Sequence, residues 1–180
     1  MVSLIAVTKA YHFTAMKHVN QRRKGVAAEP YINHLTEVAE LVAVATRGND
    51  IDLVMAAVLH DTIEDTATTM EELAAAFGLR VAELVAEVTD DKNLPKPERK
   101  RLQVEHAAHA SPRAKMIKIA DKVSNLRALG SSPPAGWSKA RIAQYVAWAT
   151  EVVAGCRGVN AWLDNEFDKA LTLVCGGEIS

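Results

Sequence analysis

The sequence is poor in cysteine and contains no long apolar run. Cys156 and Cys175 are the two cysteines among 180 residues, and they lack CxxC spacing. They are too few for a four-cysteine zinc site, and isolated thiols of this kind are typical of a reduced, cytosolic protein. No stretch approaches the roughly 18 apolar residues of a membrane-spanning helix, and the short apolar start lacks the basic region and cleavage pattern of a signal peptide. We therefore expect a cytoplasmic protein without a membrane partner.

An excess of either charge and a supply of aromatic side chains are also missing. The chain has 21 Lys and Arg against 22 Asp and Glu, which gives a formal net charge of −1. No overall field would hold it on nucleic acid, so recognition of an anion has to come from a local group of cations. Aromatic residues make up 5% of the chain and apolar residues 49%, so Ala, Val and Leu have to build the core. The length suits one domain with a sizeable core.

What the sequence does have is helical periodicity. Apolar residues recur at helical spacing, and no convincing alternating stretch predicts a strand. The expected helices run over about 3–20, 33–47, 53–60, 81–88, 98–109, 111–129, 138–156 and 160–174, with one more short helix that Thr68 or Thr69 caps and Gly78 closes. The other expected N-terminal caps are Asp50, Ser111, Ser138 and Asn160. In the first helix, the positions expected to face inward include Leu4, Val7, Tyr11, Ala15 and Val19. The pattern predicts an all-α bundle that forms a single domain over residues 1–180.

One short segment concentrates acidic and imidazole side chains. His60 and Asp61 follow the wholly apolar stretch 53–59, and Glu64 and Asp65 come three residues later. A folded protein rarely accepts that much desolvation in one place unless the groups have partners. Imidazole and carboxylate together are good ligands for a divalent metal ion. The segment therefore indicates a metal site at the end of a buried helix.

Two residues far away in the sequence complete the expected ligand set. His34 lies in the first turn of the second helix, and Asp121 follows an apolar stretch, one helical turn before Asn125. Either residue alone has an ordinary explanation, as a surface histidine or as a carboxylate paired with a nearby lysine. Together with His60 and Asp61 they supply two imidazoles and two carboxylates, which leaves positions open on a six-coordinate ion such as Mn²⁺ for water and a substrate oxygen. The remaining histidines are expected to face solvent: His12, His18, His106 and His109.

These motifs together resemble the HD-domain phosphohydrolases. The HDxxED segment with its Glu64 and Asp65 narrows the resemblance to the hydrolase domain of RelA/SpoT-type alarmone enzymes, and especially to the small alarmone hydrolases, including their metazoan members. The segments that carry the resemblance are 21–24, 29–34, 59–66, 87–92, 94–96, 98–103, 118–126 and 134–138. One position departs from the family pattern, because Leu35 stands where the family usually has proline after the first metal histidine.

The resemblance implies a reaction and a cofactor. The family hydrolyses the 3′-pyrophosphate of ppGpp and pppGpp in an Mn²⁺-dependent reaction that gives GDP or GTP and pyrophosphate. It implies an HD-type hydrolase domain with one divalent ion and with no synthetase or regulatory domain. The chemistry suits the residues, because a metal ion lowers the pKa of bound water and neutralises charge on phosphate. Glu64 and Asp65 can orient that water or move its proton, and the sequence leaves open which does which.

The implied substrate is a guanosine nucleotide, and cations at the rim of the cleft should bind it. By resemblance, the residues that contact nucleotide are Arg23, Lys24 and Asn125, with Lys96, Arg141 and Tyr145 as further candidates. Lys96 is expected in a loop, because Pro95 and Pro97 disfavour helix around them. The polar run Arg99, Lys100 and Arg101 is expected to be solvated and outside the site.

Two other functions remain open from the sequence. The same site can act on another phosphate ester beside a ribose, such as the 2′-phosphate of NADPH. A protein of a different class, a nucleotide-binding sensor with a vestigial metal site, would be indicated by the loss of a ligand or of Glu64 and Asp65, and all of these are present. No sequence feature indicates an oligomeric state.

Overall fold

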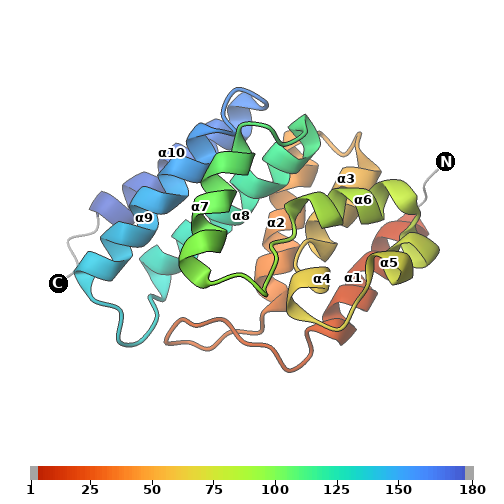
Figure 1. Cartoon of the computed structure of the whole chain (residues 1–180), viewed down its shortest axis with the longest axis horizontal. Coiled ribbons are helices and arrows are strands. Elements are labelled where there is room, and N and C mark those ends of the chain that lie inside the picture. The colour runs from red at the N-terminus through yellow and green to blue at the C-terminus, as the bar shows by residue number, and fades with distance from the viewer. Residues whose placement is uncertain (1–3, 177–180) are drawn as a thin grey trace.

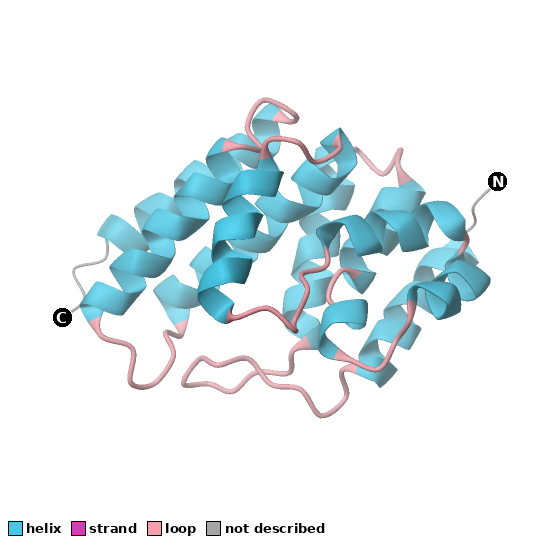
Figure 2. Cartoon of the chain, viewed as in Figure 1, coloured by secondary structure: helices cyan, strands magenta, loops and turns pink. Residues whose placement is uncertain are grey.

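The computed structural model describes residues 4–176, and this part of the chain is a bundle of helices without a strand (Figures 1 and 2). In chain order the helices are α1 (Leu4–Lys17), α2 (Ile32–Ala45), α3 (Ile51–Leu59), α4 (Thr62–Asp65), α5 (Met70–Phe77), α6 (Leu79–Val88), α7 (Lys96–Ala107), α8 (Pro112–Ser131), α9 (Lys139–Ala154) and α10 (Ala161–Gly176). None of them is both long and apolar enough to cross a membrane. The prediction of an all-α fold is confirmed.

The helices begin where the sequence supplies a cap. At five N-termini, a side-chain oxygen accepts a hydrogen bond from a backbone N–H in the first turn, which satisfies a group that has no partner inside the helix. The capping residues are Asp50, Thr69, Ser111, Ser138 and Asn160. Gly78 separates α5 from α6 with a φ of 93°, a conformation that glycine adopts without strain.

Helix α3 is the most deeply buried element. All of its residues from Leu53 to Leu59 are buried, and it packs against α1, α2 and α6. Helix α8 packs against α2 on one side and α10 on another. Because α2, α3 and α8 lie together in the middle of the bundle (Figure 1), polar side chains on them can reach one common point.

The prediction for α1 was partly wrong. Leu4 is 76% exposed and Val19, beyond the end of the helix, is 58% exposed, whereas the buried positions are Ala10 and Thr14. The Thr14 hydroxyl is satisfied because it donates to the Val58 carbonyl oxygen at 3.2 Å. The helix is only weakly amphipathic, so apolar residues did not mark its inner face. Ser3, where the predicted helix began, lies outside the described residues.

Two further predictions need correction. Helix α7 begins at Lys96, so Lys96 is helical and not in a loop; Pro97 is tolerated because the first turn of a helix does not use its N–H. The four-residue helix α4, which carries Glu64 and Asp65, was not predicted. Both changes give the candidate site residues a firmer backbone than a loop would.

Candidate metal centre and active site

Positions in or next to four helices bring the predicted metal ligands together. His34 lies in the first turn of α2, His60 directly follows α3, Asp61 directly precedes α4, and Asp121 is in the middle of α8. His34 Nε2 is 3.2 Å from Asp121 Oδ1, and His60 Nε2 is 3.3 Å from Asp61 Oδ2. The crossed pairs are 3.8 Å for His34 with Asp61 and 3.9 Å for His60 with Asp121. The four side chains thus converge on one point.

Hydrogen bonds at the far side of each imidazole determine which nitrogen carries the hydrogen. His60 Nδ1 lies 2.8 Å from the Ala57 carbonyl oxygen, which can only accept, so Nδ1 donates. His34 Nδ1 lies 2.8 Å from Ser124 Oγ, whose own hydrogen goes to Glu37 Oε2 at 2.6 Å, so this Nδ1 donates as well. Both Nε2 atoms therefore present a lone pair to the point of convergence, and His60 Nε2 is buried without a hydrogen-bond partner.

The two carboxylates are held just as firmly. Asp61 Oδ2 accepts a hydrogen bond from the Tyr31 hydroxyl at 2.6 Å. Asp121 accepts from Lys122 Nζ and from Asn125 Nδ2, both at 2.7 Å. Burial alone would raise the pKa of Asp121, but Lys122 and His34 outweigh it and hold that pKa well below its usual range. Asp121 is therefore ionised at neutral pH.

This arrangement fits a divalent metal ion. Burial lowers the pKa of His34, so the cluster presents a neutral imidazole to ionised carboxylate. Candidate ligand atoms of His34, His60 and Asp121 lie within 4.8 Å of one another. Atoms that each lie about 2.0–2.2 Å from one ion are roughly 3–4 Å apart, as here. Imidazole nitrogens that face carboxylate oxygens, with His60 Nε2 left without a hydrogen-bond partner, suit a cation between them.

Glu64 and Asp65 are neighbours in α4 but have opposite electrostatic environments. Burial, together with the Asp61 and Asp90 carboxylates, raises the pKa of Glu64 to about 7. Asp65 is also desolvated, but hydrogen bonds from Lys92 and from Gln21 lower its pKa. One carboxyl can therefore exchange a proton near neutral pH, while the other stays ionised.

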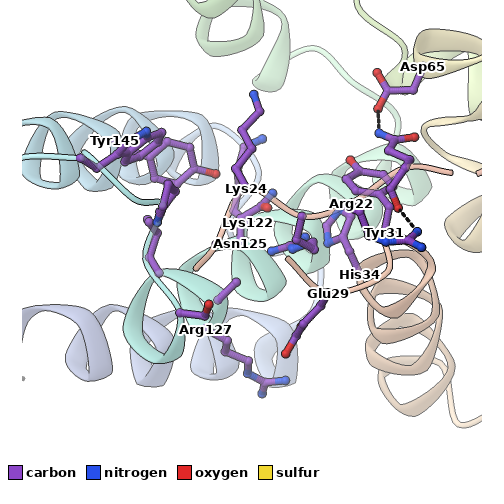
Figure 3. Close-up of a pocket in the computed structure, with 18 of the residues that line it drawn as sticks. Arg22, Lys24, Glu29, Tyr31, His34, Asp65, Lys122, Asn125, Arg127 and Tyr145 are labelled. Atoms are coloured by element: carbon purple, nitrogen blue, oxygen red, sulfur yellow. Dashed lines mark hydrogen bonds between the residues drawn. The ribbon is translucent and has the colours of Figure 1, made fainter. Parts of the chain in front are cut away.

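A cleft of about 1010 Å³ opens beside the His/Asp cluster, which consists of His34, His60, Asp61 and Asp121 (Figure 3). His34, Glu64 and Asp65 line it, with Tyr31 and His34 on one side and Tyr145 on the other. Its cationic lining residues are Arg22, Arg23, Lys24, Lys96, Arg99, Lys100, Lys122, Arg127 and Arg141. The structure thus brings all six predicted nucleotide-binding residues, Arg23, Lys24, Lys96, Asn125, Arg141 and Tyr145, to one cavity. The local group of cations that a neutral chain requires for anion binding is present.

The expectation that Arg99 and Lys100 lie outside the site was wrong. Both line the cleft; Arg99 Nη1 is 3.5 Å from Glu64 Oε1, and Lys100 Nζ lies 4.4 Å from the centre of the Trp148 ring. The sequence contained a signal for this, because Lys96, Arg99 and Lys100 share one face of a helix. Arg101 is exposed and pairs with acidic neighbours on α7, as expected of a solvated residue.

The prediction that His18 faces solvent was also wrong. His18 is 3% exposed, and its Nδ1 lies 2.6 Å from Gln21 Oε1. Its ring stacks on Tyr31, with the ring centres 5.5 Å apart. Since Gln21 donates to Asp65 and Tyr31 donates to Asp61, His18 supports two donors of the site. His12, His106 and His109 are exposed.

The fold and the His/Asp cluster define a class of protein. A model described as the HD domain matches residues 10–148, which include every candidate ligand and the cationic lining of the cleft. The protein is an HD-domain hydrolase in architecture: a helical bundle with candidate imidazole and carboxylate ligands on α2, on α8 and between α3 and α4.

Comparison with individual proteins narrows the class. The chain is 47% identical over 167 residues to "Guanosine-3′,5′-bis(diphosphate) 3′-pyrophosphohydrolase MESH1" of Danio rerio, with 93% of each chain covered. It is 51% identical over 156 residues to the Homo sapiens protein of the same name, with 87% of each covered. A solved structure described as "A metazoan ortholog of SpoT hydrolyzes ppGpp and plays a role in starvation responses" superimposes with a TM-score of 0.90 at 44% identity, covering 94% of this chain and 96% of that one. The chain belongs to the MESH1 family of HD-domain proteins.

Proposed function

We propose that the protein hydrolyses the 3′-pyrophosphate of ppGpp and pppGpp in an Mn²⁺-dependent reaction and releases pyrophosphate with GDP or GTP. The observation that carries this proposal is a His/Asp cluster beside a cation-lined cleft, which His34 of the cluster lines together with Glu64 and Asp65. The relatives named as 3′-pyrophosphohydrolases, at 47% and 51% identity, support the substrate.

The proposed ligands of the ion are His34, His60, Asp61 and Asp121. When bound, Mn²⁺ lowers the pKa of a water molecule and neutralises charge on phosphate. Glu64, whose pKa lies at about 7, is suited to accept a proton from the attacking water and to return one to the 3′ oxygen that leaves. Asp65, which Lys92 and Gln21 keep ionised, is suited to orient that water.

The proposed substrate contacts lie on the rim and the opposite wall of the cleft. Lys24, Lys96 and Arg141 are exposed cations that can bind the two diphosphate groups. Burial raises the pKa of Tyr145 to about 12, so its hydroxyl remains a neutral donor. Its ring lies beside Trp137 and Trp148, and these aromatic residues line the cleft and offer apolar contacts to a purine base.

The test is a product assay with purified protein and Mn²⁺. Incubation with ppGpp, followed by anion exchange, should show GDP and intact pyrophosphate in equal amounts. The same protein should turn over NADPH far more slowly. Inorganic phosphate as the sole first product, or a strong preference for NADPH, would replace this proposal with the phosphatase function. Tight nucleotide binding without turnover would indicate a sensor.

A further inference from the structure

A continuous series of hydrogen-bonded side chains, called the positioning chain below, runs from the His/Asp cluster to helix α10. His34 Nδ1 is 2.8 Å from Ser124 Oγ, and Ser124 Oγ is 2.6 Å from Glu37 Oε2. Arg127 Nη1 donates to Glu37 Oε1 at 3.0 Å, and Arg127 Nη2 donates to Glu166 Oε2 at 2.6 Å. The chain joins α2, α8 and α10, and α10 lies beyond the residues that the HD-domain model matches.

The direction of each hydrogen bond in this chain follows from the guanidinium. Arg127 can only donate, and both ionised carboxylates can only accept. Glu37, held at one oxygen by Arg127, therefore accepts the Ser124 hydrogen at the other. Ser124 has a single hydroxyl hydrogen, so it must accept from His34 Nδ1. Arg127, three contacts away from His34, thus keeps the Nε2 lone pair of His34 free and directed at the proposed metal site.

We infer that Ser124, Glu37, Arg127 and Glu166 form a positioning chain that fixes the tautomer and the ring orientation of His34 for metal binding. The inference rests on the proposed metal site. Partners of this kind behind a ligating histidine typically change metal affinity by 10–100-fold when they are removed. His60 has no such dependence, because its Nδ1 donates to the backbone oxygen of Ala57.

The inference also gives Arg127 a role different from that of the other cations in the cleft. Arg127 lines the cleft, as Lys24 and Arg141 do. Its guanidinium, however, is committed to Glu37 and Glu166, whose side chains are 32% and 10% exposed. Lys24 and Arg141 are exposed. Arg127 therefore acts through His34, and the exposed cations are the ones left for phosphate.

The test measures Mn²⁺ affinity in the absence of nucleotide, by the electron paramagnetic resonance signal of free Mn²⁺ at a temperature well below unfolding. We expect Ser124→Ala to weaken binding about 10–100-fold. Glu37→Gln should have a smaller effect because its amide oxygen can still accept from Ser124, and Glu166→Gln the smallest. The matched control is Asp50→Asn, which breaks an ion pair with Arg113 that does not contact the cluster; it should reduce stability but leave Mn²⁺ affinity within about twofold.

A second measurement reads the tautomer directly. In metal-free protein with ¹⁵N-labelled histidine, NMR should show the hydrogen of His34 on Nδ1 in the wild type and a mixture of tautomers in Ser124→Ala. Unchanged Mn²⁺ affinity in Ser124→Ala, or a wild-type His34 without hydrogen on Nδ1, would overturn the positioning chain. Neither measurement uses ppGpp, so a failure of the proposed substrate would leave both results standing. If the wild type bound no Mn²⁺, the proposed cofactor would be wrong, and the NMR result would still decide whether the positioning chain sets the tautomer of His34.

Discussion

The His/Asp cluster and the rim of the cleft are built in different ways. At the cluster, His34 is 3% exposed and His60 is 5% exposed, and each has its second nitrogen committed to a hydrogen bond. At the rim, Lys24, Lys96 and Arg141 are exposed side chains. Buried groups that hydrogen bonds hold from behind are already in place before a ligand arrives, whereas exposed cations lose conformational freedom only when they bind one. Substitutions in the cluster should therefore act as all-or-none changes, and substitutions at the rim should act by degrees.

The largest effect is expected at the cluster. Asp121→Asn should reduce both bound Mn²⁺ and turnover to the level of a metal-free control, because the substitution removes the charge that the ion requires. His60→Ala should behave alike. Elemental analysis set beside ppGpp turnover measures both quantities, and circular dichroism checks that the helices remain. The control is Asp168→Asn, which breaks an exposed ion pair with Arg157. Full activity of Asp121→Asn after chelation and readdition of Mn²⁺ would show that the ligand assignment is wrong.

The next effect separates proton transfer from metal binding. Glu64→Gln and Asp65→Asn should each reduce kcat by about 10²–10⁴-fold, the usual contribution of a positioned acid or base. Bound Mn²⁺ should be retained, because both residues lie beyond the His60–Asp61 pair. Elemental analysis again accompanies the kinetics. If either variant were purified without metal, the substituted residue would itself be a metal ligand. The cluster would then include a residue of α4.

A smaller, graded effect is expected at the rim. Lys24→Ala removes a charge-assisted hydrogen bond to phosphate, worth roughly 1.5–3 kcal/mol. This corresponds to a loss of about tenfold to a hundredfold in kcat/KM, mainly through a higher KM. Steady-state kinetics on ppGpp measures it, with the exposed Lys9, which does not line the cleft, changed to Ala as the control. A Lys24→Ala protein that lost its Mn²⁺ would contradict the division between cluster and rim.

The sequence predicted the cluster better than its surroundings for a physical reason. Three of the cluster residues are recognisable locally: His60 and Asp61 end an apolar stretch, and Asp121 follows another. Each is conspicuous because an unpaired polar group on a buried helix is costly. The caps at Asp50 and Ser111 were predictable in the same way, since a cap depends on residues within one turn.

The partners of the cluster depend on tertiary contacts that no local pattern encodes. Ser124 and Glu37 are 87 residues apart and meet only because α2 packs against α8. Arg99 is the exception, because Lys96, Arg99 and Lys100 share one helix face; its run of basic neighbours nevertheless resembles a solvated surface, and only the structure places it 3.5 Å from Glu64. His18 gave no signal, since its burial depends on where the loop after α1 returns to the bundle.

The smallest effect is expected at Asp50. This carboxylate accepts hydrogen bonds from several donors, as those of the cluster do, but no histidine faces it. Its side chain accepts from Arg113 and from the Leu53 N–H. Burial would raise its pKa, but Arg113 and the Leu53 N–H outweigh burial and lower the pKa below its usual value of 3.8. Asn is also a good N-cap, so Asp50→Asn removes the charge and leaves the cap.

The expected loss at pH 7 is about 0.5–1 kcal/mol, or about 1–4 °C in Tm. Because the folded-state pKa is the lower one, this stabilisation is fully present above the unfolded-state pKa near 3.8 and is lost as the pH falls through the folded-state value. Urea unfolding of wild type and variant, from pH 7 down to pH 3, should therefore show two curves that converge only below about pH 4. The gap should be the same with and without Mn²⁺. A gap that widened when Mn²⁺ was added would show that Asp50 is coupled to the cluster. It would contradict the contrast between Asp50 and the cluster, since the side-chain partners of Asp50, Arg113 and the Leu53 N–H, are not partners of a proposed metal ligand.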